Sequence, residues 1–306
     1  MTFTIYSHPD CEAHVTPPGH PERVDRMPAV LKALEGIEAD WVEAPLADDV
    51  PLLRAHPADY IAKATTAPAD GWTSLDPDTH ISATSTPAIR RAAGANVAAV
   101  DLVMGGKAKG AFCATRPPGH HAEKETAMGF CFLANASIAA LHAIEAHGAA
   151  RVAIADFDVH HGNGTQDIFD ARDDVLFISL HGDPMDAFPH FLGHADETGT
   201  GAGNGYTVNY PLPPNTDFAT WRAALQKALS HVADYAPDQL IISLGVDTFE
   251  TDPISFFKLK SEDFATYGAD IASLNLPTLF VMEGGYDIAE IGVNTVNVLQ
   301  GFEGAA

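Results

Sequence analysis

Side chains that can bind a metal ion or move a proton are concentrated in five short segments of this 306-residue chain. These segments are Arg116–His121, Asp156–Asn163, Ser179–Asp183, Gly245–Asp247 and Glu283–Tyr286. Each lies at or directly after the end of a short apolar run. In open α/β sheets, ligands bind outside the carboxyl ends of the strands. We therefore predict a single site assembled from five strand ends.

Two of the segments supply candidate metal ligands. Asp158 and His160 are two residues apart, so both side chains can point to one side of an extended segment. Together with Asp247 they form a three-ligand set that leaves a coordination position open, as in catalytic zinc sites. The set is rich in oxygen, so iron or cobalt could also occupy it. An Asp-x-His pair alone is equally explained by polar residues that cap a strand end, and the convergence of five segments is what favours a metal.

The adjacent residues His120 and His121 could move protons beside such a metal. The preceding Arg-Pro-Pro-Gly forms a stiff turn. One imidazole can act as a general base and the other as an electrostatic partner. Each needs an acceptor for its second nitrogen, and Asp156 and Asn163 are the candidates because they flank the metal ligands.

Tyr286 follows two glycines, Gly284 and Gly285, whose missing side chains let the backbone approach a ligand closely. A phenol at this position can donate a hydrogen bond to a carbonyl oxygen that becomes negatively charged. The alternative is a tyrosine that simply packs in a turn.

The elements that must position these residues alternate along the chain. Apolar runs predict strands buried on both faces of a parallel sheet, and these runs are Phe3–Tyr6, Ala111–Thr115, Val152–Phe157, Val175–Leu180, Gln239–Leu244 and Thr278–Met282. Helical patterns lie between them, at about 86–105, 132–147 and 218–235. This alternation predicts an α/β fold, a three-layer α/β/α sandwich. Without a linker or a break in composition, we expect residues 1–306 to form one domain.

Composition and charge indicate which partners and which compartment suit this protein. The formal net charge of −24 disfavours nucleic-acid binding and favours cationic substrates, although solubility at high salt would also explain it. The three cysteines are widely spaced, as expected for reduced thiols. The first ten residues predict a short strand instead of a signal peptide, and no apolar run is long enough to span a membrane. We therefore expect a cytoplasmic protein.

The segments that carry this chemistry resemble the signature blocks of the zinc-dependent histone deacetylase superfamily. The matching blocks are RPPGHHA, GFCFLANASIAA, DFDVHHGNGTQDIF, GVDTF and EGGY, with HPERVDR at 20–26 extending the resemblance to most of the chain. The resemblance implies the arginase–deacetylase fold, with a mainly parallel eight-stranded sheet. It also implies a metal-dependent amidohydrolase.

The resemblance assigns roles residue by residue. The zinc ligands would be Asp158, His160 and Asp247; the catalytic residues His120, His121, Tyr286, Asp156 and Asn163; the substrate-binding residues Phe130, Phe188, Gly129 and Gly284; and the ligands of a structural potassium ion Asp156, Ser179 and Leu180 with Asp158 and His160. Asn163 stands where some relatives carry Asp. His121 then lacks a charged partner, so we expect its pKa to be lowered.

One branch of the superfamily fits better than the others. The segments at 181–203, 245–259 and 281–299 resemble bacterial acetylpolyamine amidohydrolases, which implies hydrolysis of N-acetylated polyamines to acetate and free polyamine. Residues 66–88 are short where some of those relatives carry an insertion that builds a dimer. The insertion's acidic, substrate-gripping residues have no counterpart, and Asp76 and Asp78 are the candidates that remain. Whether this chain is a homodimer stays open.

Three alternatives remain beside the polyamine interpretation. A protein (histone-like) lysine deacetylase would share every catalytic residue and differ only at the mouth of the site. A binuclear manganese ureohydrolase would need further ligands to bridge a second metal. A binding module without activity would be expected to have lost Tyr286 or a metal ligand, and none is missing.

Overall fold

A computed structural model describes residues 3–305; Met1, Thr2 and Ala306 lie outside it, so the predicted N-terminal strand is described from Phe3 onward. Its centre is an eight-stranded, all-parallel sheet in the order β2-β1-β5-β10-β9-β6-β7-β8. The strands are β1 (Phe3–Ser7), β2 (Ala39–Glu43), β5 (Gly110–Cys113), β6 (Val152–Asp156), β7 (Val175–Gly182), β8 (Thr207–Leu212), β9 (Gln239–Leu244) and β10 (Thr278–Met282).

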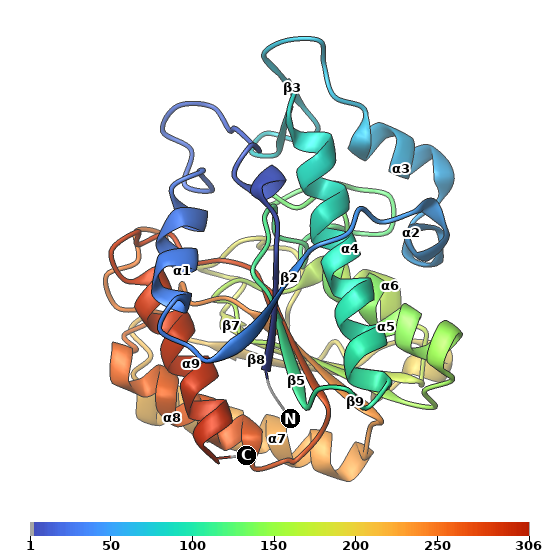
Figure 1. Ribbon diagram of the computed structural model, residues 1–306. Helices are drawn as coiled ribbons and strands as arrows, with labels where there is room; N and C mark the ends of the chain where they lie inside the picture. Colours follow the sequence, from blue (N-terminus) through green and yellow to red (C-terminus); the bar gives the residue numbers. More distant parts are fainter. Residues whose placement is uncertain (1–2, 306) are drawn as a thin grey trace.

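Helices cover both faces of this sheet (Figure 1). One face carries α1 (Arg26–Leu34), α7 (Phe218–Tyr235), α8 (Ser261–Ala272) and α9 (Ile291–Ala305). The other carries α2 (Asp49–Ala55), α3 (Ala58–Thr65), α4 (Ser85–Met104), α5 (Asn135–His147) and α6 (Asn163–Phe169). The predicted three-layer α/β/α architecture is therefore confirmed.

Alternation within the central strands divides the core in two. In β9, Leu240 and Ile242 pack on the α7–α9 side, while Ile241 packs on the α4–α5 side. Because successive strand residues point to opposite faces, a strand covered on both sides must be apolar throughout. All six predicted strands are present for this reason, and the helix predicted at 218–235 has the same bounds as α7.

The sequence analysis missed two strands of the main sheet, β2 and β8. Both lie at its edges, where only one neighbour is needed and the apolar pattern is weaker. Trp41 in β2 is 47% exposed, and β8 contains Pro211, which cannot donate a hydrogen bond to a ladder.

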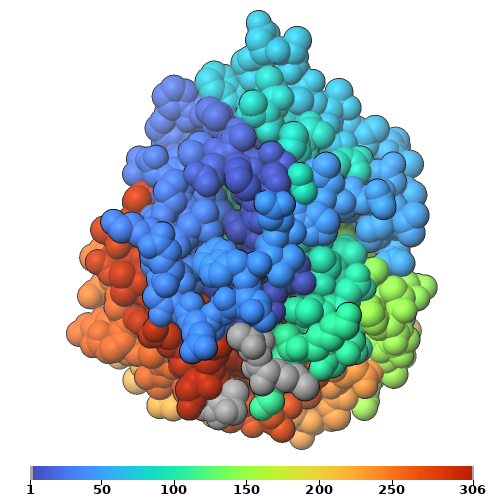
Figure 2. All heavy atoms as spheres, viewed as in Figure 1, coloured from blue at the N-terminus to red at the C-terminus, as the bar shows by residue number. Residues whose placement is uncertain are grey.

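The parallel sheet brings the predicted site segments to one edge. Strands β5, β10, β9, β6 and β7 are consecutive neighbours, so the loops that follow them meet. A small hairpin, β3 (Trp72–Ser74) and β4 (His80–Ser82), lies close to this edge, and Figure 2 shows its segment as the projecting tip of the molecule. None of the helices within residues 3–305 is both long and apolar enough to cross a membrane.

A buried ion cluster ties the N-terminal segment to two of these loops. The Glu22 carboxylate accepts hydrogen bonds from Arg26 (2.9 Å to Nη1) and from Arg116 (2.7 Å to Nη2), and all three side chains are fully buried. Arg26 also donates to the carbonyls of Gly285 and Glu283. Burial alone would raise the pKa of Glu22, but the two guanidinium groups hold it well below its usual value.

We expect Glu22→Gln to lower the free energy of unfolding by about 3–5 kcal/mol, because it leaves two buried arginines without a counter-charge. Since the pKa of Glu22 is lowered on folding, its contribution is present above its ordinary pKa of 4.5 and is lost as the pH falls below that value. Chemical denaturation of both proteins at several pH values measures this. Asp49→Asn, which removes the exposed partner of Arg90, is the control and should change stability by less than about 1 kcal/mol.

Candidate active site

The three predicted metal ligands meet at the carboxyl ends of β6 and β9. One ligand atom from each of Asp158, His160 and Asp247 lies within 4.8 Å of the others. Nδ1 of His160 is 3.1 Å from Asp158 Oδ1 and 3.6 Å from Asp247 Oδ2. The other oxygen of each aspartate accepts a hydrogen bond from a backbone N–H group. Gly284 N donates to Asp158 Oδ2 (2.8 Å), and Val159 N donates to Asp247 Oδ1 (2.9 Å).

The charges of this cluster fit a divalent cation. Asp247 Oδ2 is buried and has no hydrogen-bond partner among the described residues. Burial and the neighbouring Asp158 carboxylate raise the pKa of Asp247 to about 7. Two carboxylates buried this close together both stay ionised only if a positive charge compensates them. Asp158, His160 and Asp247 would hold such a cation, which would supply that charge.

The two adjacent histidines each have the partner that the sequence analysis predicted. His120 Nδ1 is 3.0 Å from Asp156 Oδ2, and His121 Nδ1 is 2.7 Å from Asn163 Oδ1. The two rings are tilted, with centroids 3.9 Å apart, and both are buried. This part of the predicted arrangement is present in the structure.

The two histidines differ in their protonation. Burial alone would lower the pKa of His120, but the carboxylates of Asp156 and Asp158 raise it to about 10. The pKa of His121 is well below its ordinary value, first because of burial and then because of the positive charges of His120 and His160. The pair therefore combines a charged imidazolium with a neutral imidazole. The lowered pKa of His121 agrees with our expectation, although burial is its main cause.

Helix α6 fixes the backbone of the pair from behind. Gly164 N donates to the carbonyl of His120 (3.0 Å), and a Cβ at Gly164 would lie only 2.2 Å from the carbonyl oxygen of Ala122. Only glycine permits this contact. The helix begins at Asn163, which places that side chain against His121.

Tyr286 lies in the loop that follows β10. Its backbone N–H donates to Asp252 Oδ2 (2.6 Å), and the Arg26 guanidinium lies 4.7 Å from its ring centroid. Burial raises the pKa of the phenol, so it remains a hydrogen-bond donor. Gly284 is needed in this loop because a Cβ there would lie 2.1 Å from Asp247 Oδ2.

Phe130 and Phe188 flank the site as predicted for its walls. The Phe188 ring lies 4.9 Å from that of His121, and the Phe130 ring lies 5.9 Å from that of Tyr286. Gly129 has a φ of +54° and would place a Cβ 2.3 Å from the ring of His121. Of the four predicted substrate-binding residues, three therefore line the site, and Gly284 packs beneath the metal ligands.

The hairpin at residues 72–82 supports one of these walls. Asp78 Oδ1 accepts a hydrogen bond from Gly129 N (3.2 Å), and Thr79 Oγ1 accepts one from Phe130 N (3.0 Å). Asp76 Oδ1 accepts from the backbone of Asp78 and Thr79. The carboxylates of Asp76 and Asp78 thus accept hydrogen bonds from backbone N–H groups, those of Asp76 within the hairpin turn and that of Asp78 from Gly129.

The sequence analysis assigned no role to two carboxylates that hold the site, Glu283 and Glu123. Glu283 Oε2 accepts from Gly119 N (2.7 Å) and His120 N (3.2 Å). Asn163 Nδ2 donates to Glu123 Oε1 (2.9 Å). Glu283 directly follows β10 and Glu123 follows the two histidines, so their positions beside the motifs were the available signal. Neither carries a spacing pattern that distinguishes it from a solvated carboxylate.

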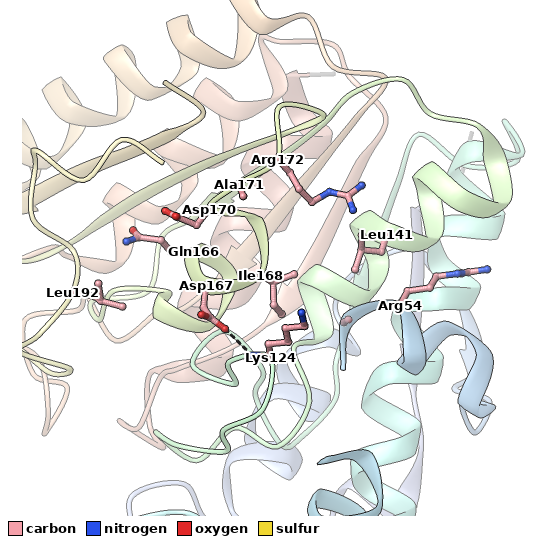
Figure 3. Close-up of a pocket in the computed structure, with 11 residues that line it drawn as sticks. Arg54, Lys124, Leu141, Gln166, Asp167, Ile168, Asp170, Ala171, Arg172 and Leu192 are labelled. Carbon is pink, nitrogen blue, oxygen red and sulfur yellow. Dashed lines mark hydrogen bonds between the residues drawn. The ribbon is translucent and has the colours of Figure 1, made fainter. Parts of the chain in front are cut away.

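A cavity of about 580 Å³ lies apart from these residues (Figure 3). Arg54, Lys124 and Arg172 contribute basic side chains to it, and α6 contributes Asp167 and Ile168. None of the predicted site residues lines it. The chemistry described above therefore belongs to a different part of the molecule.

Comparisons with known proteins identify the family of this chain. The histone deacetylase domain family matches residues 18–302. The chain is 54% identical over 236 residues to acetylpolyamine amidohydrolase 1 of Pseudomonas aeruginosa, a match that covers 77% of this chain and 68% of that protein. A solved acetylpolyamine aminohydrolase from Burkholderia pseudomallei superposes with a TM-score of 0.90 at 31% identity, covering 99% of both chains. The solved structure of the HDA15 HD domain superposes on this chain with a TM-score of 0.94 at 31% identity. The superposition covers 100% of this chain and 90% of that one.

We expect Asp158→Ala and Asp247→Ala each to abolish stoichiometric zinc binding, because removing either ligand leaves too few donors for a stable site. Elemental analysis of the purified variants measures this. The control is Asp101→Ala, which disrupts a second, exposed group formed with His142 and His147 and should leave the zinc content unchanged. One full equivalent of zinc in either ligand variant would contradict the assignment.

Proposed function

From the premise that this chain belongs to the histone deacetylase domain family, we propose that it hydrolyses N-acetylated polyamines to acetate and free polyamine. The family makes it a metal-dependent deacetylase; the substrate class is our inference. The observation that carries the proposal is geometric: His120 is paired with the carboxylate of Asp156 and His121 with the amide of Asn163. Both pairs lie beside the Asp158, His160 and Asp247 ligand set.

Asp158, His160 and Asp247 would hold the zinc ion of the family. When bound, zinc supplies Lewis acidity, which polarises an amide carbonyl and lowers the pKa of water. The two aspartates also restrain the loops around them through Gly284 N and Val159 N, so the ligands are oriented before the ion arrives.

His121 is the proton-transfer residue of the proposal. Its Nδ1–H donates to Asn163, which leaves Nε2 as the basic nitrogen. Nε2 takes a proton from the attacking water and later gives it to the leaving nitrogen, so that the C–N bond breaks as acetate and a free amine form. His120 keeps its proton, because Asp156 stabilises the imidazolium, and its charge favours the developing negative charge.

Tyr286 supplies the hydrogen-bond donor of the proposed site. Its neutral hydroxyl donates to the carbonyl oxygen as that oxygen becomes negative. Arg26 and Asp252 hold the ring and the backbone of Tyr286 in place.

The proposal includes a structural potassium ion at Asp156, Ser179 and Leu180 with Asp158 and His160. Its support is that Asp156 and Ser179 are paired residues of the neighbouring strands β6 and β7, which brings these two chain segments side by side. Oxygen donors of this kind suit a hard cation.

The polyamine assignment rests on two arguments. The curated relative that matches 77% of the chain at 54% identity is named an acetylpolyamine amidohydrolase. The net charge of −24 favours the approach of a small polycation. A protein lysine deacetylase remains the alternative outcome of the test, because the family that matches residues 18–302 is the histone deacetylase domain family.

We expect Tyr286→Phe to lower kcat by about 10²–10³-fold while KM changes little, because the lost hydrogen bond forms mainly in the transition state. Steady-state kinetics on the preferred substrate and zinc analysis of the same sample measure this. An unchanged kcat with normal zinc content would remove Tyr286 from the mechanism.

Acetylputrescine, acetylcadaverine and acetylspermidine should each be hydrolysed with a higher kcat/KM than an acetyl-lysine peptide. Their kcat/KM should also fall as salt rises from about 0.02 M to 0.5 M, since attraction between exposed charges is screened beyond about 10 Å at 0.1 M. N-butylacetamide, a neutral amide of similar length, is the control and should respond much less. A peptide that is hydrolysed faster than every acetylpolyamine would establish the protein deacetylase alternative.

A further inference from the structure

We propose that Glu123 is a positioning residue for the reaction: its carboxylate orients the side-chain amide of Asn163, and this amide holds His121 in its active tautomer. The inference rests on the proposed function, in which His121 transfers protons. Glu123 is not a catalytic residue, because Asn163 separates it from His121.

The three side chains form a continuous hydrogen-bonded chain. Asn163 Nδ2 donates to Glu123 Oε1 at 2.9 Å, and Asn163 Oδ1 accepts from His121 Nδ1 at 2.7 Å. Asn163 and His121 are buried, whereas Glu123 is half-buried at the outer end of the chain. The amide dipole of Asn163 therefore points along the line that joins a carboxylate to the buried imidazole.

The direction of these bonds depends on Glu123. An asparagine amide can present either its oxygen or its NH₂ group to a neighbour, whereas an ionised carboxylate can only accept. Next to Glu123, the NH₂ group must face outward and Oδ1 must face His121. A histidine that meets an acceptor at Nδ1 carries its proton there and keeps Nε2 free to act as a base.

Without Glu123, the constraint on the amide is weak. The remaining contacts of Asn163 Nδ2 are Met128 Sδ at 3.3 Å and the His121 carbonyl at 3.4 Å, which are long or involve a poor acceptor. If the amide reverses, it donates to His121 Nδ1 and stabilises the tautomer protonated at Nε2. In that tautomer Nε2 already carries a proton, so it cannot accept one from water.

The loop that carries Glu123 is fixed in position. Glu123 N donates to the carbonyl of Thr126 (2.9 Å), which closes a tight turn. Lys124 N donates to Asp167 Oδ2 (2.9 Å), and Figure 3 shows this bond linking the loop to α6. Because Asn163 is the first residue of the same helix, Glu123 and Asn163 are held on one rigid unit.

A double-mutant cycle tests the role of Glu123. Glu123→Ala should lower kcat by about 10- to 100-fold with KM and zinc content little changed, as for other groups that orient a site residue from behind. Glu123→Gln keeps an acceptor oxygen, although its amide can also turn its NH₂ group towards Asn163. The decrease in kcat should therefore be smaller than for Glu123→Ala. The matched control is Glu125→Gln, which removes one exposed charge from the same loop and has no side-chain hydrogen bond within residues 3–305.

The decisive variant is Asn163→Asp, because an aspartate can only accept and fixes the tautomer of His121 without help. In this background Glu123→Gln should raise kcat, since it removes a carboxylate repelled by the new aspartate and supplies a donor to it. The effect of Glu123→Gln thus reverses sign between the two backgrounds. The same loss of kcat in both would show a structural role only and would overturn the proposal.

The tautomer itself can be read without any substrate. In the zinc-loaded full chain with ¹⁵N-labelled histidine, the ring nitrogen shifts of His121, assigned with His121→Asn, should report a proton on Nδ1 in the wild type and a shift towards Nε2 in Glu123→Ala. Unchanged shifts in Glu123→Ala would overturn the inference, even if the wild type hydrolyses acetylpolyamines. An inactive wild type with the expected shifts would instead refute the proposed function alone.

Discussion

The constraint on which this structure depends is the burial of negative charge. Asp156, Asp158, Asp247 and Glu283 are fully buried at the ends of three neighbouring strands, β6, β9 and β10. Carboxylates in a medium of low polarisability must be paired with positive charge or with N–H donors. The protein uses both means, because backbone amides bind several of these oxygens and His120 carries a proton among them. Among the described residues, Asp247 Oδ2 and Glu283 Oε1 have no hydrogen-bond partner, and the Asp247 oxygen belongs to the ligand set that would hold a metal ion.

This arrangement explains why two neighbouring histidines of the same type behave differently. His120 faces the ionised Asp156, whereas His121 faces the neutral amide of Asn163. A charged partner raises the pKa of His120, whereas His121, with a neutral partner, has a lowered pKa. The positive charge of the first histidine then lowers the pKa of the second, so the two properties depend on each other. The same logic recurs behind the site, where one glutamate is held between two arginines.

Much of this architecture follows from the sequence because parallel strands covered on both faces are uniformly apolar, and because the polar residues at their ends are arranged in compact motifs. The edge strands β2 and β8 were missed, since partial exposure and Pro211 weaken their pattern. Asp76 and Asp78 were considered for binding substrate, yet their carboxylates hold backbone N–H groups. Glu123 and Glu283 each bind groups that are far away in the sequence: Glu123 binds the amide of Asn163, and Glu283 binds the backbone of Gly119 and His120. No rule of residue spacing identifies the partner of a single carboxylate.

The hairpin at residues 72–82 supports one wall of the site but contributes no side chain to the metal ligands. It reaches the site through backbone hydrogen bonds to Gly129 and Phe130, and none of its residues belongs to the metal cluster. Lengthening or shortening this segment would therefore reshape one wall while leaving the ligands in register.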